Sequence, residues 1–226
     1  RGGSGAVISG GKRNATRSDY GVIGGGYANT AGVSAASDRF ATIGGGASNL
    51  VTGGRGTIAG GTDNIGSGDG SVIGGGQENL AAGVVSTIGG GIENYATGNY
   101  AVVAGGFGNQ AAGHGAVVGG GGYDLVYEGN KAIGMAVTVA GGVGNIASNN
   151  YASVGGGNRN MARSMAAVIG GGYANDIGTN SESSVIAGGR DNRVHPDSWY
   201  GTIAGGLQNA IGTNRDYSTI GGGQMN

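Results

Sequence analysis

The hydrophobic positions of this chain recur at a nearly constant interval along its length. In each copy an aliphatic residue, here called the anchor, precedes a small residue, two glycines, two variable residues and, in thirteen of fourteen copies, an asparagine. The anchors are Ile8, Ile23, Ile43, Ile58, Ile73, Ile88, Val103, Val118, Val139, Val154, Ile169, Ile186, Ile203 and Ile220. Eight of the intervals between anchors are 15 residues, and the others are 17, 20 or 21. A fixed period of this size is typical of stacked repeats.

The residues around each anchor alternate with a period of two, as in the stretches 40–43 and 100–103. Such alternation over four residues indicates a short β-strand. The anchor and the small residue two positions before it share one face, which we expect to form the core. We expect a second strand after the asparagine, with its inward residue eight positions after the anchor. These second inward residues are Ala31, Val51, Ala81, Ala96, Ala111, Val126, Ala147, Ala162, Ile177, Val194 and Ile211.

Glycine and asparagine mark the bend between the two strands. The Gly-Gly pair permits a sharp or left-handed backbone, and asparagine tolerates the left-handed region and can hydrogen-bond its own turn. Stacked turns would align the asparagines into a side-chain ladder. The ladder residues are Asn14, Asn29, Asn49, Asn64, Asn79, Asn94, Asn109, Asn145, Asn160, Asn175, Asn192, Asn209 and Asn226. In the remaining copy, Asp124 holds this position.

These patterns predict an all-β chain, a parallel β-solenoid or β-roll of about fourteen turns of 15–17 residues. One turn cannot bury its hydrophobic face alone, but stacked neighbours can. We expect residues 1–226 to form a single solenoid domain without evident capping repeats. Some copies are longer than 15 residues. We expect their additional residues to lie between the second strand and the next anchor strand, where they would form loops on one face. These segments are Val33–Arg39, Tyr123–Ala136, Ile177–Ser183, Val194–Ser198 and Ile211–Asp216.

Composition narrows the functional classes. Only 11% of the residues are charged and the net charge is −1, so the basic surface of a nucleic-acid-binding protein is absent. The chain has no cysteine for disulfides, and no apolar run of about 18 residues that would predict a transmembrane helix. Glycine supplies 59 residues, but the single proline argues against collagen, and the periodic aliphatic residues argue against disorder.

The sequence contains no constellation typical of an active site or a metal site. Gly10-Gly11-Lys12-Arg13 lacks the spacing and the hydroxyl of a phosphate-binding loop. A calcium-binding β-roll needs aspartates in its turns, where this chain has neutral asparagines. The histidines His114 and His195 have no other metal ligands clustered near them by spacing. We therefore predict no catalytic, cofactor-binding or metal-binding residues, and a protein that is not an enzyme.

The segment His195–Tyr200 is chemically unusual, since it contains the only tryptophan and the only proline. Aromatic side chains dominate recognition hot spots, so this segment and the longest insertion supply candidate contact residues. These candidates are Tyr123, Tyr127, His195, Trp199 and Tyr200. The alternative interpretation is that Trp199 packs on the neighbouring turn without a binding role.

The residue just before each anchor points outward by the same alternation. It is valine in seven copies, threonine in six and serine in one. An exposed column of this kind normally marks an interaction site, and we expect it to pack against another copy of the chain. Two alternatives are the ordering of water on ice and an exposed column without a partner. Aromatic residues recur three positions before the anchor, at Tyr20, Phe40, Tyr100, Tyr151, Tyr200 and Tyr217.

The stretches Ser71–Gly83 (SVIGGGQENLAAG) and Ser86–Gly98 (STIGGGIENYATG) resemble the head repeats of trimeric autotransporter adhesins. Those heads are left-handed parallel β-rolls in which three chains pack side by side. The resemblance covers nearly the whole chain, although the family's repeat is typically one residue shorter, and this sequence shows no heptad stalk or membrane anchor. Related glycine-rich repeats occur in bacterial and phage-type fibre proteins. The resemblance implies surface display and adhesion as a trimer.

We therefore expect a structural or adhesive protein, outside the cell or at the cell surface, whose main partner is itself. Assembly could be lateral, end to end or both. The repeat is in register from Ser4 to Asn226, and open β-edges are templates for another chain, so copies would stack or neighbouring domains have been removed. The start at Arg1 suggests a processed or excised segment. The rival hypothesis is a module that binds a host receptor, a glycan or ice through its insertion loops, like a phage-type tail fibre tip.

Overall fold

The computed structural model describes residues 3–33, 39–123 and 128–226. Every regular element in these residues is a two-residue β-strand, and none is a helix. The chain divides into two compact units, Arg1–Gly108 and Asn109–Asn226, and each unit contains seven anchor strands. Each unit is a parallel β-solenoid, and the chain has about fourteen turns, so the predicted fold class is confirmed.

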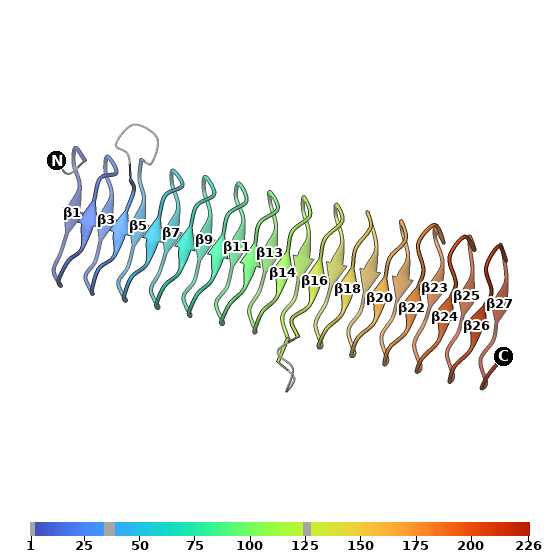
Figure 1. The fold of residues 1–226 in the computed structure, drawn as a ribbon. Coiled ribbons are helices and arrows are strands. Elements are labelled where there is room, and N and C mark those ends of the chain that lie inside the picture. The colour runs from blue at the N-terminus through green and yellow to red at the C-terminus, as the bar shows by residue number, and fades with distance from the viewer. Residues whose placement is uncertain (1–2, 34–38, 124–127) are drawn as a thin grey trace. The chain divides into compact units, whose positions relative to one another are not determined.

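In the first unit, successive strands alternate between two parallel sheets (Figure 1). The sheet that carries the anchors, here called the anchor sheet, consists of β1 (Val7–Ile8), β3 (Val22–Ile23), β5 (Thr42–Ile43), β7 (Thr57–Ile58), β9 (Val72–Ile73), β11 (Thr87–Ile88) and β13 (Val102–Val103). The second sheet consists of β2 (Ala15–Thr16), β4 (Thr30–Ala31), β6 (Leu50–Val51), β8 (Ile65–Gly66), β10 (Leu80–Ala81) and β12 (Tyr95–Ala96).

The second unit repeats this arrangement. Its anchor sheet consists of β15 (Val117–Val118), β17 (Thr138–Val139), β19 (Ser153–Val154), β21 (Val168–Ile169), β23 (Val185–Ile186), β25 (Thr202–Ile203) and β27 (Thr219–Ile220). Its second sheet consists of β14 (Gln110–Ala111), β16 (Lys131–Ala132), β18 (Ile146–Ala147), β20 (Met161–Ala162), β22 (Asp176–Ile177), β24 (Arg193–Val194) and β26 (Ala210–Ile211).

Neighbouring strands of a sheet pair in the register of the repeat. Val72 pairs with Thr87, and Ile73 pairs with Ile88. Equivalent residues of successive turns therefore lie in columns within each unit. Two arcs connect the sheets: the glycine arc runs from the anchor to the asparagine, and the return arc runs from the second strand to the next anchor strand.

The core of each unit is thin and built from the predicted inward residues. Ile58 and Val51 have no exposed surface, and neither has Ala41, which lies two positions before an anchor. A Cβ atom on Gly66 would lie 3.7 Å from Cγ1 of Ile58, so the inward residues of the two sheets face each other. The first and last anchors are exceptions, because 43% of the Ile8 surface is exposed and Ile220 is half-buried.

The asparagine ladder runs through the interior of each unit. The side-chain amide of Asn79 donates hydrogen bonds to the carbonyl oxygens of Gly75 (3.1 Å) and Gly91 (2.9 Å) and to Oδ1 of Asn64 (3.0 Å). Its own Oδ1 accepts a hydrogen bond from the backbone N–H of Asn94 (3.0 Å). Each buried asparagine therefore ties its glycine arc to the turns on both sides.

The ladder contains one asparagine that the repeat pattern did not identify. In the 21-residue interval after Val118, Asn130 occupies the ladder, whereas the pattern placed Asp124 at the asparagine position of that copy. The backbone N–H of Asn130 donates to Oδ1 of Asn109 (2.9 Å), and its side-chain amide donates to the carbonyl oxygens of Gly120 and Gly142 (both 2.8 Å). An ionised aspartate has no N–H to donate to these carbonyls, so the position requires an amide.

The insertion in this turn therefore lies in the glycine arc and not in the return arc. The strand after Asn130 is β16, and its Ala132 takes the inward position that was expected for Val126. Val126 itself lies outside the described residues. The residues added in the 17-residue turns do lie in the return arc, for example between β22 and β23. The expectation that all insertions share one face is therefore wrong.

Candidate functional site

The outer side of the anchor sheet is flat and uncharged in each unit. The residue before each anchor is valine, threonine or serine, and the residue after it is glycine, alanine or serine in all fourteen copies. These two columns are here called the anchor face. The residues before the anchors are exposed or half-buried, as Val72 is at 40% exposure, and the residues after the anchors are exposed. No side chain of this face is larger than valine.

The outward residues of the second sheet are about as exposed as those of the anchor face, but their side chains vary widely in size and charge. Apart from Asp176, which is buried, these residues are exposed or half-buried. They are Ala15, Thr30, Leu50, Ile65, Leu80, Tyr95, Gln110, Lys131, Ile146, Met161, Asp176, Arg193 and Ala210. The outward position of a strand in this solenoid therefore accepts large, polar and charged side chains.

Two glycine columns border the anchor face, and the chain's own packing explains them to different degrees. Gly46, at the third position after its anchor, has a φ of 90°, and a Cβ atom there would lie 2.1 Å from the carbonyl oxygen of Gly61. The fold therefore requires a glycine at this position. Gly45 and Gly60, at the second position, have φ values outside the left-handed region, and a Cβ atom on either would meet nothing within 4 Å. Gly75, in the same column, has a φ of 148°, which supplies a conformational reason for glycine there.

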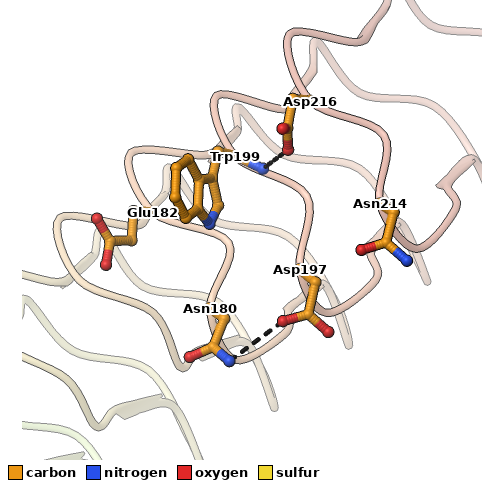
Figure 2. Close-up of a pocket in the computed structure, with 6 residues that line it drawn as sticks. All are labelled: Asn180, Glu182, Asp197, Trp199, Asn214 and Asp216. Atoms are coloured by element: carbon orange, nitrogen blue, oxygen red, sulfur yellow. Dashed lines mark hydrogen bonds between the residues drawn. The ribbon is translucent and has the colours of Figure 1, made fainter.

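A groove lies along the return arcs of three successive 17-residue turns in the second unit (Figure 2). Its volume is about 280 Å³. Each turn contributes two lining residues, and equivalent residues are 17 positions apart. One column consists of Asn180, Asp197 and Asn214, and the other consists of Glu182, Trp199 and Asp216.

The two additional residues of each 17-residue turn create the corner on which the groove is built. Asn180, Asp197 and Asn214 adopt left-handed backbone conformations with φ values of 53°, 58° and 56°, which asparagine and aspartate tolerate better than most residues. Buried serines hold the corner from inside. The hydroxyl of Ser181 donates to the carbonyl of His195 (2.9 Å) and accepts the backbone N–H of Ser198 (3.3 Å). The groove therefore has a supported backbone.

Trp199 lies between Glu182 and Asp216 at the centre of the groove, with 49% of its surface exposed (Figure 2). Oδ1 of Asp216 accepts the backbone N–H of Trp199 (2.8 Å), and the side chain of Asn180 donates to Oδ1 of Asp197 (3.1 Å). The side chains of Glu182 and Trp199 make no hydrogen bond with the described residues, and the same holds for the side chain of Asn214. No lysine, arginine or histidine lines the groove.

The predicted contact residues are not gathered in one place. Only Trp199 lines the groove. His195 lies in the same return arc, and Tyr200 stacks on Tyr217 with ring centroids 5.0 Å apart. Tyr123 is 62% exposed but belongs to a glycine arc, and Tyr127 lies outside the described residues. The sequence interpretation missed the five polar residues around Trp199, although the 17-residue spacing of the two Asn/Asp/Glu columns was a usable signal.

Charged side chains form a separate cluster beside the second sheet of the second unit. The buried carboxylate of Asp176 pairs with Arg163, and Nε of Arg193 lies 3.5 Å from Oδ2 of Asp176. Outside this cluster, in the glycine arcs of the same unit, Nε of Arg159 donates a hydrogen bond to Oε2 of Glu128 (3.0 Å), which raises the pKa of Arg159. Within the described residues, no group of three or more His, Cys, Asp or Glu side chains could hold a metal ion.

Comparison with known proteins assigns no family. A scan against protein-family models gave no match, and a search of curated proteins found no matching sequence. Over the part of the chain that the structure describes, no helix is long and apolar enough to span a membrane. The surfaces described above therefore carry the functional argument.

Proposed function

We propose that this chain is a non-enzymatic structural and adhesive element that associates laterally with copies of itself through the anchor face. The resemblance of its repeats to adhesin heads supports adhesion and a place at the cell surface or outside the cell.

The observation that carries the proposal is the unequal chemistry of the two outward columns. Both columns lie on parallel two-residue strands of the same solenoid and have similar exposure. The second column varies from alanine to arginine, whereas the anchor face is restricted to small and β-branched residues in every turn. The chain's own packing explains the small residue after each anchor, because a Cβ atom on Gly44 would lie 2.3 Å from the carbonyl oxygen of Ala59. It does not explain why only valine, threonine and serine precede the anchors, because the backbone accepts large side chains at the corresponding position of the second sheet. Close packing against a flat partner would explain this restriction.

The chemistry of the anchor face favours a second copy as the partner. The face carries no charge, so two copies can meet without burying an unpaired ion, which would be strongly unfavourable. The chain's own packing does not require glycine at sites such as Gly45 and Gly60. Glycine there means that no side chain projects at the border of the anchor face. Because glycine has no Cβ atom, another backbone can approach closely at these positions.

Analytical ultracentrifugation of the full chain between about 1 and 100 μM tests the proposal. We expect the mass to rise from the 21.6 kDa of one chain to a multiple of it. The double variant Thr57→Lys, Val72→Lys places two charges on the anchor face and should remain monomeric, because like charges would face each other across the interface.

The matched control is Ile65→Lys, Leu80→Lys, which places two charges on the outer column of the second sheet in the same turns. This control should associate as the unmodified chain does. A monomeric unmodified chain at the highest concentration, or equal loss of association in both double variants, would contradict the proposal. Circular dichroism checks that all three proteins have the same strand content.

A further inference from the structure

The groove around Trp199 is not used by the anchor face, and it has the composition of a ligand site. We propose that it binds one pyranose unit of a neutral glycan. This proposal is independent of lateral association, because the groove lies on the return arcs of the second unit and the anchor face lies on the anchor sheet.

The size of the groove suits a small ligand or one unit of a longer one. Its volume of about 280 Å³ lies just below the range of roughly 300–1,000 Å³ that is typical of small-molecule pockets. The serine hydrogen bonds beneath it fix the backbone that carries the lining residues. The backbone of the groove therefore needs little ordering on binding, and preorganisation of this kind increases affinity.

Trp199 supplies a flat aromatic surface on which a sugar ring can stack. The face of an aromatic ring carries the negative part of its quadrupole. The axial C–H groups of a pyranose form a flat patch with partial positive charge, so this patch can stack on the indole. About half of the Trp199 surface is exposed at the centre of the groove, where a sugar ring can reach it.

The polar rim offers both donors and acceptors, as sugar hydroxyls require. Asn214 has a free amide that can donate and accept, and Glu182 has a free carboxylate that can only accept. Hydrogen bonds from hydroxyls to a carboxylate are charge-assisted and roughly twice as strong as neutral ones. Asp197 and Asp216 retain acceptor capacity beyond the hydrogen bonds that they already make.

The charge of the groove sets the class of sugar. Glu182, Asp197 and Asp216 line it without a basic residue, so a sialylated, sulfated or uronic sugar would be repelled. A cation would use the carboxylates but not the amide donor of Asn214. A neutral polyol is the ligand that uses the indole face, the amide and the carboxylates together.

Trp199 is the only tryptophan, so its fluorescence reports directly on the groove. The probes are the methyl glycosides of glucose, galactose, mannose and N-acetylglucosamine, with their neutral tetrasaccharides and a sialylated oligosaccharide. For at least one neutral probe, we expect a saturable change with a dissociation constant on the order of 1 mM for the monosaccharide. The sialylated probe should not bind.

Variants that retain Trp199 test the assignment of roles. Glu182→Gln and Asn214→Ala should each weaken binding about tenfold. Trp199→Ala, measured by calorimetry, should abolish it. Tyr151→Ala is the matched control, since Tyr151 is an aromatic residue with 55% exposure in the same unit that does not line the groove, and its binding should be unchanged.

Three outcomes would overturn the proposal. One is the absence of a fluorescence change with every neutral probe. Another is equal loss of binding in Tyr151→Ala and in the groove variants. The third is preferential binding of tetramethylammonium or hexalysine over all the sugars, which would make the groove a cation site. None of these outcomes affects the sedimentation test of lateral association.

Discussion

The outward residue before each anchor and the outward residue of the second sheet have similar backbone settings but different chemistry. Both sheets present one outward residue per two-residue strand, and both pair their strands in parallel and in register. The second sheet places leucine, tyrosine, lysine, aspartate and arginine at this position, whereas the anchor sheet admits only valine, threonine and serine. The turns of one chain thus act as an internal control. Folding alone accounts for the alternation and for the small residue after each anchor. We propose that lateral association accounts for the restriction of the residue before each anchor to valine, threonine and serine.

The largest difference in stability is expected between substitutions of two neighbouring glycines at the border of the anchor face. Gly46→Val should destabilise the fold by more than about 4 kcal/mol, because its φ is 90° and its Cβ would collide with the carbonyl oxygen of Gly61. Gly45→Val should change the free energy of unfolding by less than about 1 kcal/mol, since its Cβ would point into open space. Urea unfolding followed by circular dichroism measures both.

The same pair of glycines sharpens the comparison of the two faces. Gly45→Val should fold and yet associate less than the unmodified chain in the ultracentrifuge, because a partner would meet the new side chain. If Gly45→Val associates normally, the glycine column does not border an interface. If it fails to fold, the chain itself requires that glycine and the argument from open space is wrong.

A smaller loss of stability is expected from a substitution in the asparagine ladder, which lies in the interior between the two sheets. Asn79→Asp should destabilise the fold by about 3–5 kcal/mol, because a buried carboxylate would face the carbonyl oxygens of Gly75 and Gly91 without an N–H to donate. Asn99→Asp is the matched control, since exposed Asn99 only accepts a hydrogen bond from Val84. Its free energy of unfolding should change by less than about 0.5 kcal/mol. Equal unfolding midpoints would show that the ladder does not depend on its amides.

The smallest effects on stability separate the faces most directly. Thr87→Leu on the anchor face and Leu80→Thr on the second sheet should each change the free energy of unfolding by less than about 0.5 kcal/mol. The first should weaken self-association about tenfold, equivalent to about 1.4 kcal/mol, because a longer side chain holds two flat faces apart. The second should leave association unchanged. Similar sedimentation of the two variants would remove the distinction between the faces.

The sequence by itself determined the repeat, the identity of the core residues and the existence of the ladder. The reason is local. A period of two fixes which side chains point inward, and glycine and asparagine fix the bend between the strands through their backbone preferences. Ile58, Val51 and Asn79 could therefore be placed inside the solenoid without any knowledge of long-range contacts.

Only the tertiary structure decided where the insertion after Val118 lies and which residues surround Trp199. Asp124 and Asn130 both suit a bend, but only Asn130 can donate to the carbonyl oxygens of Gly120 and Gly142 in the stacked turns. Glu182, Trp199 and Asp216 follow one another at intervals of 17 residues, and they form one column only because the turns stack in register. Which partner a side chain meets in the next turn depends on that register, and local preferences do not contain it.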